Sequence, residues 1–235
     1  MSSHCIWYSV VMNRKPFELQ EWYHCFNRGV EKRIVFESEL DANRFLSLLY
    51  LANGTKAVDL FNERKPTLEK AFQVNRGNPI VAIGAYCLMP NHFHLLLKEI
   101  SEGGITLFMK KVGIAYAMYF NAKNERVGNL FVKPFRSRHI STDRYFQRVL
   151  QYIHCNPAEL FESGWKAGTV KNMNTLEKKL IEYKYSSFGS YTGFKTVSPV
   201  LSREGFDIEN QMPVSRMLEE ARAYYAEIVE HRLER

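Results

Sequence analysis

The alternation of apolar and polar residues predicts a small set of strands. Residues 21–28, EWYHCFNR, alternate with a period of two, which is typical of a half-buried strand. A longer apolar stretch is divided by Pro90-Asn91, a dipeptide that turns or bulges the chain. We therefore expect strands at 21–28, 80–89, 92–99 and, interrupted at Pro134, at 129–140.

Apolar residues at spacings of three and four predict helices between these strands. Ser38 is a candidate cap for a helix from Glu39 to about Asn53. Its expected apolar side is Leu40, Phe45, Leu48, Leu49 and Leu51. Further helices are expected at 104–121, at 143–156 with a cap at Thr142 and a stop at Pro157, near 175–180, and over 215–235. Residues 55–78 are interpreted as an exposed insertion with one helical turn after Thr67, and Ile34 to Phe36 as a short apolar return.

The order strand, helix, strand, strand, helix, strand, helix indicates an α+β fold. An antiparallel sheet with helices on one face, close to a ferredoxin-like βαββαβ core, satisfies this order. The expected organisation is an N-terminal extension over 1–20, a catalytic domain over 21–192 and a C-terminal helical tail over 193–235.

Two histidines on the predicted strand 92–99 are candidates for metal binding. His92 and His94 are two apart, so their side chains project to one face, with Phe93, Leu95 and Leu97 on the buried face. Two adjacent imidazoles suit a divalent metal. Chance alone predicts roughly 0.2 such pairs in a chain with this many histidines, so the pair by itself is a weak motif. The alternative is a pair of polar residues on a solvent-facing strand.

The predicted helix 143–156 carries a second group of candidates. Arg148, Tyr152 and Asn156 are spaced by four and share one face, about 120° from the apolar stripe of Phe146, Leu150 and Ile153. Tyr152 is either functional or an aromatic at the core margin, and Asn156 is either a ligand or a helix end. Other polar residues receive lesser roles: Tyr145 as a weaker nucleophile candidate, His154 and Cys155 as structural neighbours, and His24 as a packing residue without a partner.

The charge of the chain favours a polyanionic partner. The formal net charge is +7, and nine basic residues against two acidic ones lie between residues 110 and 150. A phosphate backbone fits this concentration, although a solvated basic face is the alternative. The candidate DNA-binding residues are Lys110, Lys111, Lys133, Arg136, Arg138 and Arg148.

The expected cellular compartment follows from the cysteine pattern and from the lack of long apolar runs. Four cysteines are scattered without a C-x-x-C pair, which favours a reduced, cytoplasmic protein. No apolar run approaches the ~20 residues of a membrane span, and no signal peptide is expected.

Five stretches give these observations a common context: WYHCFNRGVEKRIVF, AYCLMPNHFHLLLK, GNLFVKPFRSRHI, DRYFQRVLQYIHCNPAEL and YKYSSFGSY. In this order the chain resembles the single-tyrosine HUH transposases of the IS200 type, in particular the REP-associated tyrosine transposase group. The resemblance implies that His92 and His94 bind metal, that Asn156 is a third ligand, and that Tyr152 is the nucleophile.

The activity implied by the resemblance is metal-dependent cleavage and strand transfer of single-stranded DNA through a 5′-phosphotyrosine intermediate. Mg²⁺ or Mn²⁺ suits two imidazoles and one amide oxygen. The implied partner is hairpin-forming single-stranded DNA, and a monomer is favoured over a dimer. Two alternatives are a non-catalytic DNA- or RNA-binding protein derived from a transposase, and a metal phosphohydrolase using an activated water.

Overall fold

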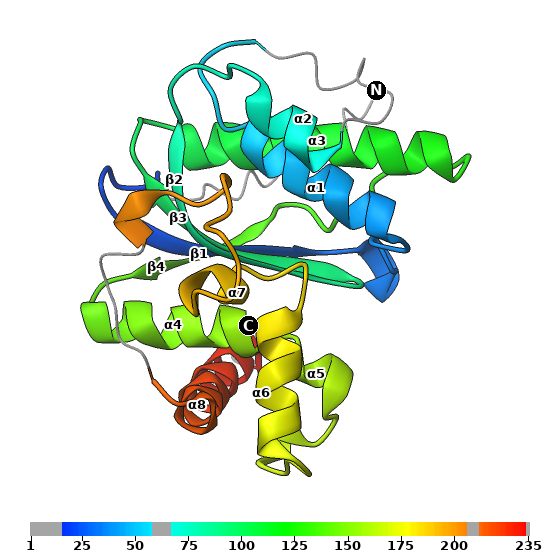
Figure 1. The fold of residues 1–235 in the computed structure, drawn as a ribbon. Helices are drawn as coiled ribbons and strands as arrows, with labels where there is room; N and C mark the ends of the chain where they lie inside the picture. The colour runs from blue at the N-terminus through cyan, green and yellow to red at the C-terminus, as the bar shows by residue number, and fades with distance from the viewer. Residues whose placement is uncertain (1–15, 58–66, 206–211, 234–235) are drawn as a thin grey trace, which may run out of the picture.

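The computed structural model describes residues 16–57, 67–205 and 212–233, with side chains up to residue 227. A four-stranded sheet is formed by β1 (Trp22–Arg28), β2 (Val81–Met89), β3 (His92–Glu99) and β4 (Arg136–Ile140). The order is β2-β3-β1-β4, and every neighbouring pair is antiparallel. With α1 (Glu39–Leu51) before β2 and α3 (Gly104–Lys123) before β4, this is the predicted ferredoxin-like βαββαβ arrangement (Figure 1).

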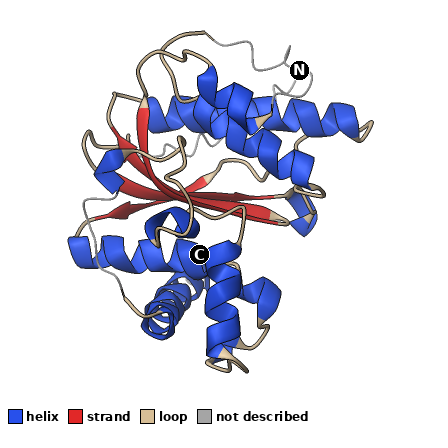
Figure 2. Ribbon diagram, in the orientation of Figure 1, coloured by secondary structure: helices blue, strands red, loops and turns tan. Residues whose placement is uncertain are grey.

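Helices cover both faces of the sheet, so the expectation of helices on one face was wrong (Figure 2). The α3 face carries α1, α2 (Leu68–Gln73) and α3. The α4 face carries α4 (Asp143–Cys155), α5 (Ala158–Phe161), α6 (Met173–Glu182), α7 (Phe188–Tyr191) and α8 (Val214–Leu233). Short 3₁₀ turns occur at Val30–Lys32, Trp165–Ala167 and Arg203–Gly205.

The two helical layers follow from the side-chain pattern of the central strands. On β3, Phe93, Leu95 and Leu97 enter the core under α1 and α3, as predicted. Leu96 points the other way, into a second core with Phe146, Ile153 and other residues of the α4 face. Because the sheet has apolar positions on both faces, each face needs a helical cover.

Helix α1 begins as the sequence predicts and ends two residues early. The Ser38 hydroxyl accepts from the Asp41 N–H, and the Asp41 carboxylate accepts from the Ser38 N–H, forming a capping box. Leu40 lies on the outer side of this first turn and is 63% exposed, so its assignment to the apolar side was wrong. At the other end Asn53 leaves the helix, because its amide binds the backbone of Ile80 and Val81 where β2 begins.

One further boundary differs from the predictions, and two other segments are seen in more detail. Residues 34–36 form no strand, although Val35 is buried and its N–H donates to the Pro90 carbonyl. The fourth strand starts only at Arg136, after Pro134. Pro157 ends α4 but also serves as the N-cap of α5, a position where its missing N–H costs no hydrogen bond.

Segments after residue 192 also belong to the two cores. Val200 is buried on the α3 face, and Val214, Leu218 and Ala221 are buried on the α4 face. The proposed domain boundary at residue 192 stays a prediction, as does an extension over residues 1–20, most of which lie outside the described residues.

Candidate active site

The two histidines of β3 lie together on the α4 face, as their spacing predicts. The ring centroids of His92 and His94 are 5.1 Å apart and their planes cross at 86°. His92 is half-buried, whereas His94 is 5% exposed. His94 is therefore not a polar residue on a solvent-facing strand, which was the alternative to a metal ligand.

Helix α4 brings two more candidates to these histidines. The Tyr152 ring centroid lies 5.2 Å from that of His94. One turn later, at the C-cap of α4, the Asn156 amide oxygen is 3.2 Å from His92 Nε2. The structure thus unites His92, His94, Tyr152 and Asn156 in one cluster on a rigid strand and a rigid helix.

The hydrogen bonds of His92 determine which of its nitrogens is available. Asn91 Nδ2 donates to the Lys32 carbonyl, so its Oδ1 faces His92 Nδ1 at 2.6 Å. Burial lowers the pKa of His92 to about 4, which leaves the ring neutral at pH 7 with a single proton. That proton is on Nδ1, because Asn91 Oδ1 can only accept. The unprotonated Nε2 therefore faces the Asn156 oxygen.

Two electron-rich atoms 3.2 Å apart suit a cation between them. Ligand atoms about 2.1 Å from an ion and at right angles to each other lie about 3 Å apart, so this pair matches one edge of an octahedral site. Within the described residues, no three His, Cys, Asp or Glu side chains form a metal cluster. A metal site here needs an amide ligand, and the two imidazoles with Asn156 fit Mg²⁺ or Mn²⁺ in chemistry.

His24 on β1 has polar partners that the sequence does not predict. Its Nε2 is 2.9 Å from His94 Nδ1, and its Nδ1 is 2.7 Å from the Tyr224 hydroxyl on α8. Burial, followed by the nearby Arg138, lowers the pKa of His24 to about 3, so the ring is neutral. The expectation that His24 packs without a partner was wrong. The alternation of Trp22, His24 and Phe26 places it on the right face, but only the strand pairing brings it to His94.

Helix α8 covers the face of α4 that carries Arg148 and Tyr152. Arg148 pairs with two carboxylates of α8, Glu220 at 3.2 Å and Glu227 at 3.8 Å. Tyr152 is 6% exposed because the Tyr224 ring packs 4.9 Å from it, measured between centroids. Tyr152 is therefore buried rather than at the core margin, because the apolar stripe of Phe146, Leu150 and Ile153 describes only one of the two buried sides of α4.

The lesser candidates of α4 have structural partners. The Tyr145 hydroxyl donates to Glu227, and His154 Nε2 lies 2.9 Å from the Ser187 hydroxyl. Cys155 is fully buried in the second core. His154 and Cys155 thus fit the structural role that was expected.

The basic candidates fall into two groups. Lys110 and Lys111 are on α3, on the opposite face of the sheet, and Lys111 donates to the Gly54 carbonyl. Lys133 and Arg136 are exposed at β4, and Arg138 is half-buried on the same strand. The basic residues of the β4 edge, unlike those of α3, therefore belong to the same sheet as the two histidines.

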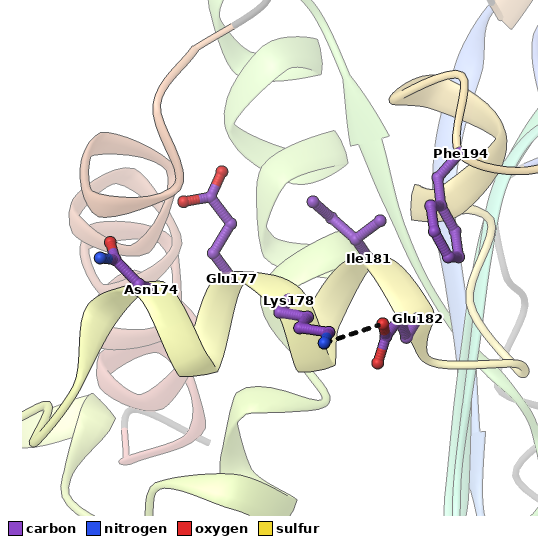
Figure 3. Close-up of a pocket in the computed structure, with 6 residues that line it drawn as sticks. All are labelled: Asn174, Glu177, Lys178, Ile181, Glu182 and Phe194. Atoms are coloured by element: carbon purple, nitrogen blue, oxygen red, sulfur yellow. Dashed lines mark ion pairs between the residues drawn. The ribbon is translucent and has the colours of Figure 1, made fainter.

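A shallow pocket of about 360 Å³ lies elsewhere, on α6 (Figure 3). It is lined by Asn174, Glu177, Lys178, Ile181, Glu182 and Phe194. Lys178 is paired with Glu182 at 3.9 Å, and no residue of the histidine cluster lines the pocket. Its two acidic side chains do not suit a phosphate.

Comparison with known proteins adds one strong similarity. The family model "Transposase IS200 like" matches residues 22–156, more than half of the chain. A solved structure, "Structure of the REP associates tyrosine transposase bound to a REP hairpin", is 14% identical, with a TM-score of 0.44, and the match covers 85% of this chain and 90% of that one. That likeness is too weak to transfer any residue's role. No curated protein matches the chain. Among the described helices, none combines the length and apolarity of a membrane span.

Proposed function

The chain belongs to the IS200-like transposase family, and from this premise we propose that it cleaves and rejoins single-stranded DNA with Tyr152 as the nucleophile. The observation that supports the proposal is the meeting of β3 and α4. His92 Nε2 and Asn156 Oδ1 are 3.2 Å apart, and the Tyr152 ring stands against His94 at 5.2 Å. A tyrosine beside a set of metal ligands is what a phosphodiester transfer requires.

In this proposal, His92, His94 and Asn156 hold Mg²⁺ or Mn²⁺. The bound ion would polarise a non-bridging phosphate oxygen and stabilise the charge that develops there. Asn91 contributes by fixing the ring of His92 with its free nitrogen toward Asn156. Such outer hydrogen bonds orient a ligand and determine which nitrogen binds.

The proposed transfer conserves bonds and charge. The Tyr152 oxygen forms a bond to phosphorus while the bond from phosphorus to O3′ breaks, and the phenolic proton replaces phosphorus on O3′. The products are a 5′-phosphotyrosine link and a free 3′-hydroxyl. Because one phosphodiester replaces another, attack by a 3′-hydroxyl on the link reverses the step without an external energy source.

The proposed DNA contacts are on the β4 side. Lys133 and Arg136 are exposed there and suit the phosphates of a hairpin-forming single strand. This partner is favoured by the charge of the chain and by the family, whose name denotes DNA transposition.

One observation favours a second candidate, a nucleic-acid-binding protein without cleavage. Tyr152, His94 and Asn156 are 6%, 5% and 2% exposed, so a phosphate reaches them only if neighbouring side chains move. A protein of this family that has lost catalysis would retain the same fold and the basic edge.

The test is covalent capture of DNA. Wild-type protein is incubated with single-stranded hairpin DNA and Mn²⁺ and examined on a denaturing gel. We expect an adduct in the wild type and in the control Tyr225→Phe, and none in Tyr152→Phe, with binding retained. Binding without an adduct in any divalent metal would establish the second candidate instead, and turnover that survives in Tyr152→Phe would indicate a phosphohydrolase.

A further inference from the structure

One corner of the α4 face of the sheet lies beside the two histidines and carries an aromatic ring between two arginines. Directly opposed residues of antiparallel strands point to the same face. The register places Arg28 opposite His92. Phe26 lies between His94 on β3 and Arg136 on β4. Phe26, Arg28 and Arg136 therefore share the face of the histidines, and we call these three residues the β1 corner.

Helix α4 crosses this face and leaves the β1 corner open. At the start of the helix Phe146 packs on Trp22, with ring centroids 5.1 Å apart, and at its end Asn156 reaches His92. Trp22 is the first residue of β1, whereas Arg28 is the last and lies next to His92. The helix therefore runs from β1 at one end of the sheet to β3 at the other (Figure 1), and Arg28 stays exposed.

Phe26 is an aromatic side chain that belongs to neither of the two apolar cores of the described residues. It is half-buried, and its ring contacts are the imidazoles of His24 at 4.9 Å and His94 at 5.6 Å, measured between centroids. The part of the ring that stays exposed therefore lies beside a candidate metal ligand. An aromatic ring in this position suits stacking of a planar partner such as a nucleobase.

Arg28 and Arg136 add positive charge on two sides of this ring. Both are exposed, and neither guanidinium has an ion pair or a hydrogen bond within the part of the chain that the structure describes. Arg28 is two residues from Phe26 on the same strand, about 7 Å away, and Arg136 is its cross-strand neighbour, about 5 Å away. A ring flanked by two cations matches the alternation of bases and phosphates in a single strand.

We propose that Phe26 stacks a base of single-stranded DNA and that Arg28 and Arg136 contact the phosphates on either side of it, so that the β1 corner guides the strand to the histidines. The step from this corner to the cleaved phosphate rests on the proposed function, whereas binding of the strand requires no cleavage. The alternative is that Phe26 only shields the histidines from solvent. Its effect on binding would then not depend on the bases of the DNA.

The test for Phe26 separates bases from phosphates, in a Tyr152→Phe background without divalent metal, so that no cleavage occurs. A fluorescent oligothymidine of about 12 nucleotides is compared with an abasic strand of the same length by fluorescence anisotropy. We expect Phe26→Leu to weaken binding of the oligothymidine about 5- to 100-fold and to leave the abasic strand nearly unchanged. Phe26→Tyr keeps the ring and should bind like the parent protein. Phe194→Leu, at an exposed phenylalanine of the α6 pocket, is the control.

The test for Arg28 uses the same two strands at several salt concentrations. Arg28→Ala should weaken binding of both strands and reduce the slope of log K against log salt concentration by about 0.7. The control is Arg203→Ala, at an exposed arginine beside β2, the edge strand opposite β4, and it should leave both values unchanged.

Each outcome decides the inference separately from the proposed cleavage. Equal effects of Phe26→Leu on the two strands, equal effects of Arg28→Ala and Arg203→Ala, or no binding by the parent protein would overturn the β1 corner as a DNA-binding surface. The expected binding results, together with no covalent adduct in the wild type, would leave the inference intact and refute cleavage. A wild-type adduct whose formation and binding are unchanged in Phe26→Leu and Arg28→Ala would strike the inference alone.

Discussion

The Tyr224 hydroxyl is a single group that can be removed from the hydrogen bonds of the buried His24 without opening a large cavity. Tyr224 is fully buried, and its ring packs against Tyr152 at 4.9 Å. Tyr224→Phe preserves this ring and removes only the hydroxyl that is hydrogen-bonded to His24 Nδ1 at 2.7 Å.

The size of the effect follows from the groups left behind. A buried His24 ring nitrogen that is left without a hydrogen-bond partner costs about 1–3 kcal/mol. We expect the free energy of unfolding to fall by about 2 kcal/mol, the middle of that range. For a protein of this size, that corresponds to a decrease in Tm of roughly 4–8 °C.

Urea unfolding of matched variants is the assay. Tyr225→Phe, on the same helix, is the control, because the Tyr225 hydroxyl has no hydrogen bond among the described residues and its ring stacks under Lys166 at 4.3 Å. It should change stability by less than about 0.5 kcal/mol. Equal losses in the two variants would show that the Tyr224 hydroxyl is not part of a satisfied network and would refute the reasoning.

Two further predictions concern stability in acid and DNA binding. Burial raises the pKa of the Asp41 carboxyl, but hydrogen bonds from Lys123 and Tyr119 outweigh it and hold the pKa below its ordinary value. The stability from Asp41 is therefore present above about pH 4 and is lost as the pH falls through the lowered value. Urea unfolding should show Asp41→Asn to be less stable than the wild type at pH 7, with a smaller deficit at pH 2. An equal deficit at both pH values would contradict this. In hairpin-DNA titrations, Lys133→Ala should weaken binding and reduce the slope of log K against log salt concentration by about one. Lys110→Ala, on the opposite face of the sheet, should leave binding unchanged. The reverse ranking would place the DNA on α3.

The sequence predicts the parts of the site that local periodicity governs. Residues two apart on a strand point to the same face, and this places His92 with His94. Residues four apart on a helix share a face, and this aligns Arg148, Tyr152 and Asn156. Caps are also local, so Ser38 and Thr142 mark the starts of α1 and α4 as expected.

The parts that were missed depend on which elements meet. His24 binds His94 across 70 residues and Tyr224 across 200, and neither distance leaves a trace in the local pattern. Strand order determines the first contact and helix docking the second. An amphipathic helix over 215–235 was predicted, but periodicity does not say what the helix packs against. The ion pairs of Arg148 with Glu220 and Glu227 were therefore not foreseen, and its DNA contact stays a prediction.

The central claim is that His92, His94 and Asn156 surround one ion beside Tyr152. Anomalous diffraction at the manganese edge, from crystals of the protein grown with Mn²⁺, tests it most directly. The account predicts a single strong peak about 2.1–2.3 Å from His92 Nε2, His94 Nε2 and Asn156 Oδ1. Full occupancy of Mn²⁺ at any other position, with no peak between β3 and the end of α4, would contradict it.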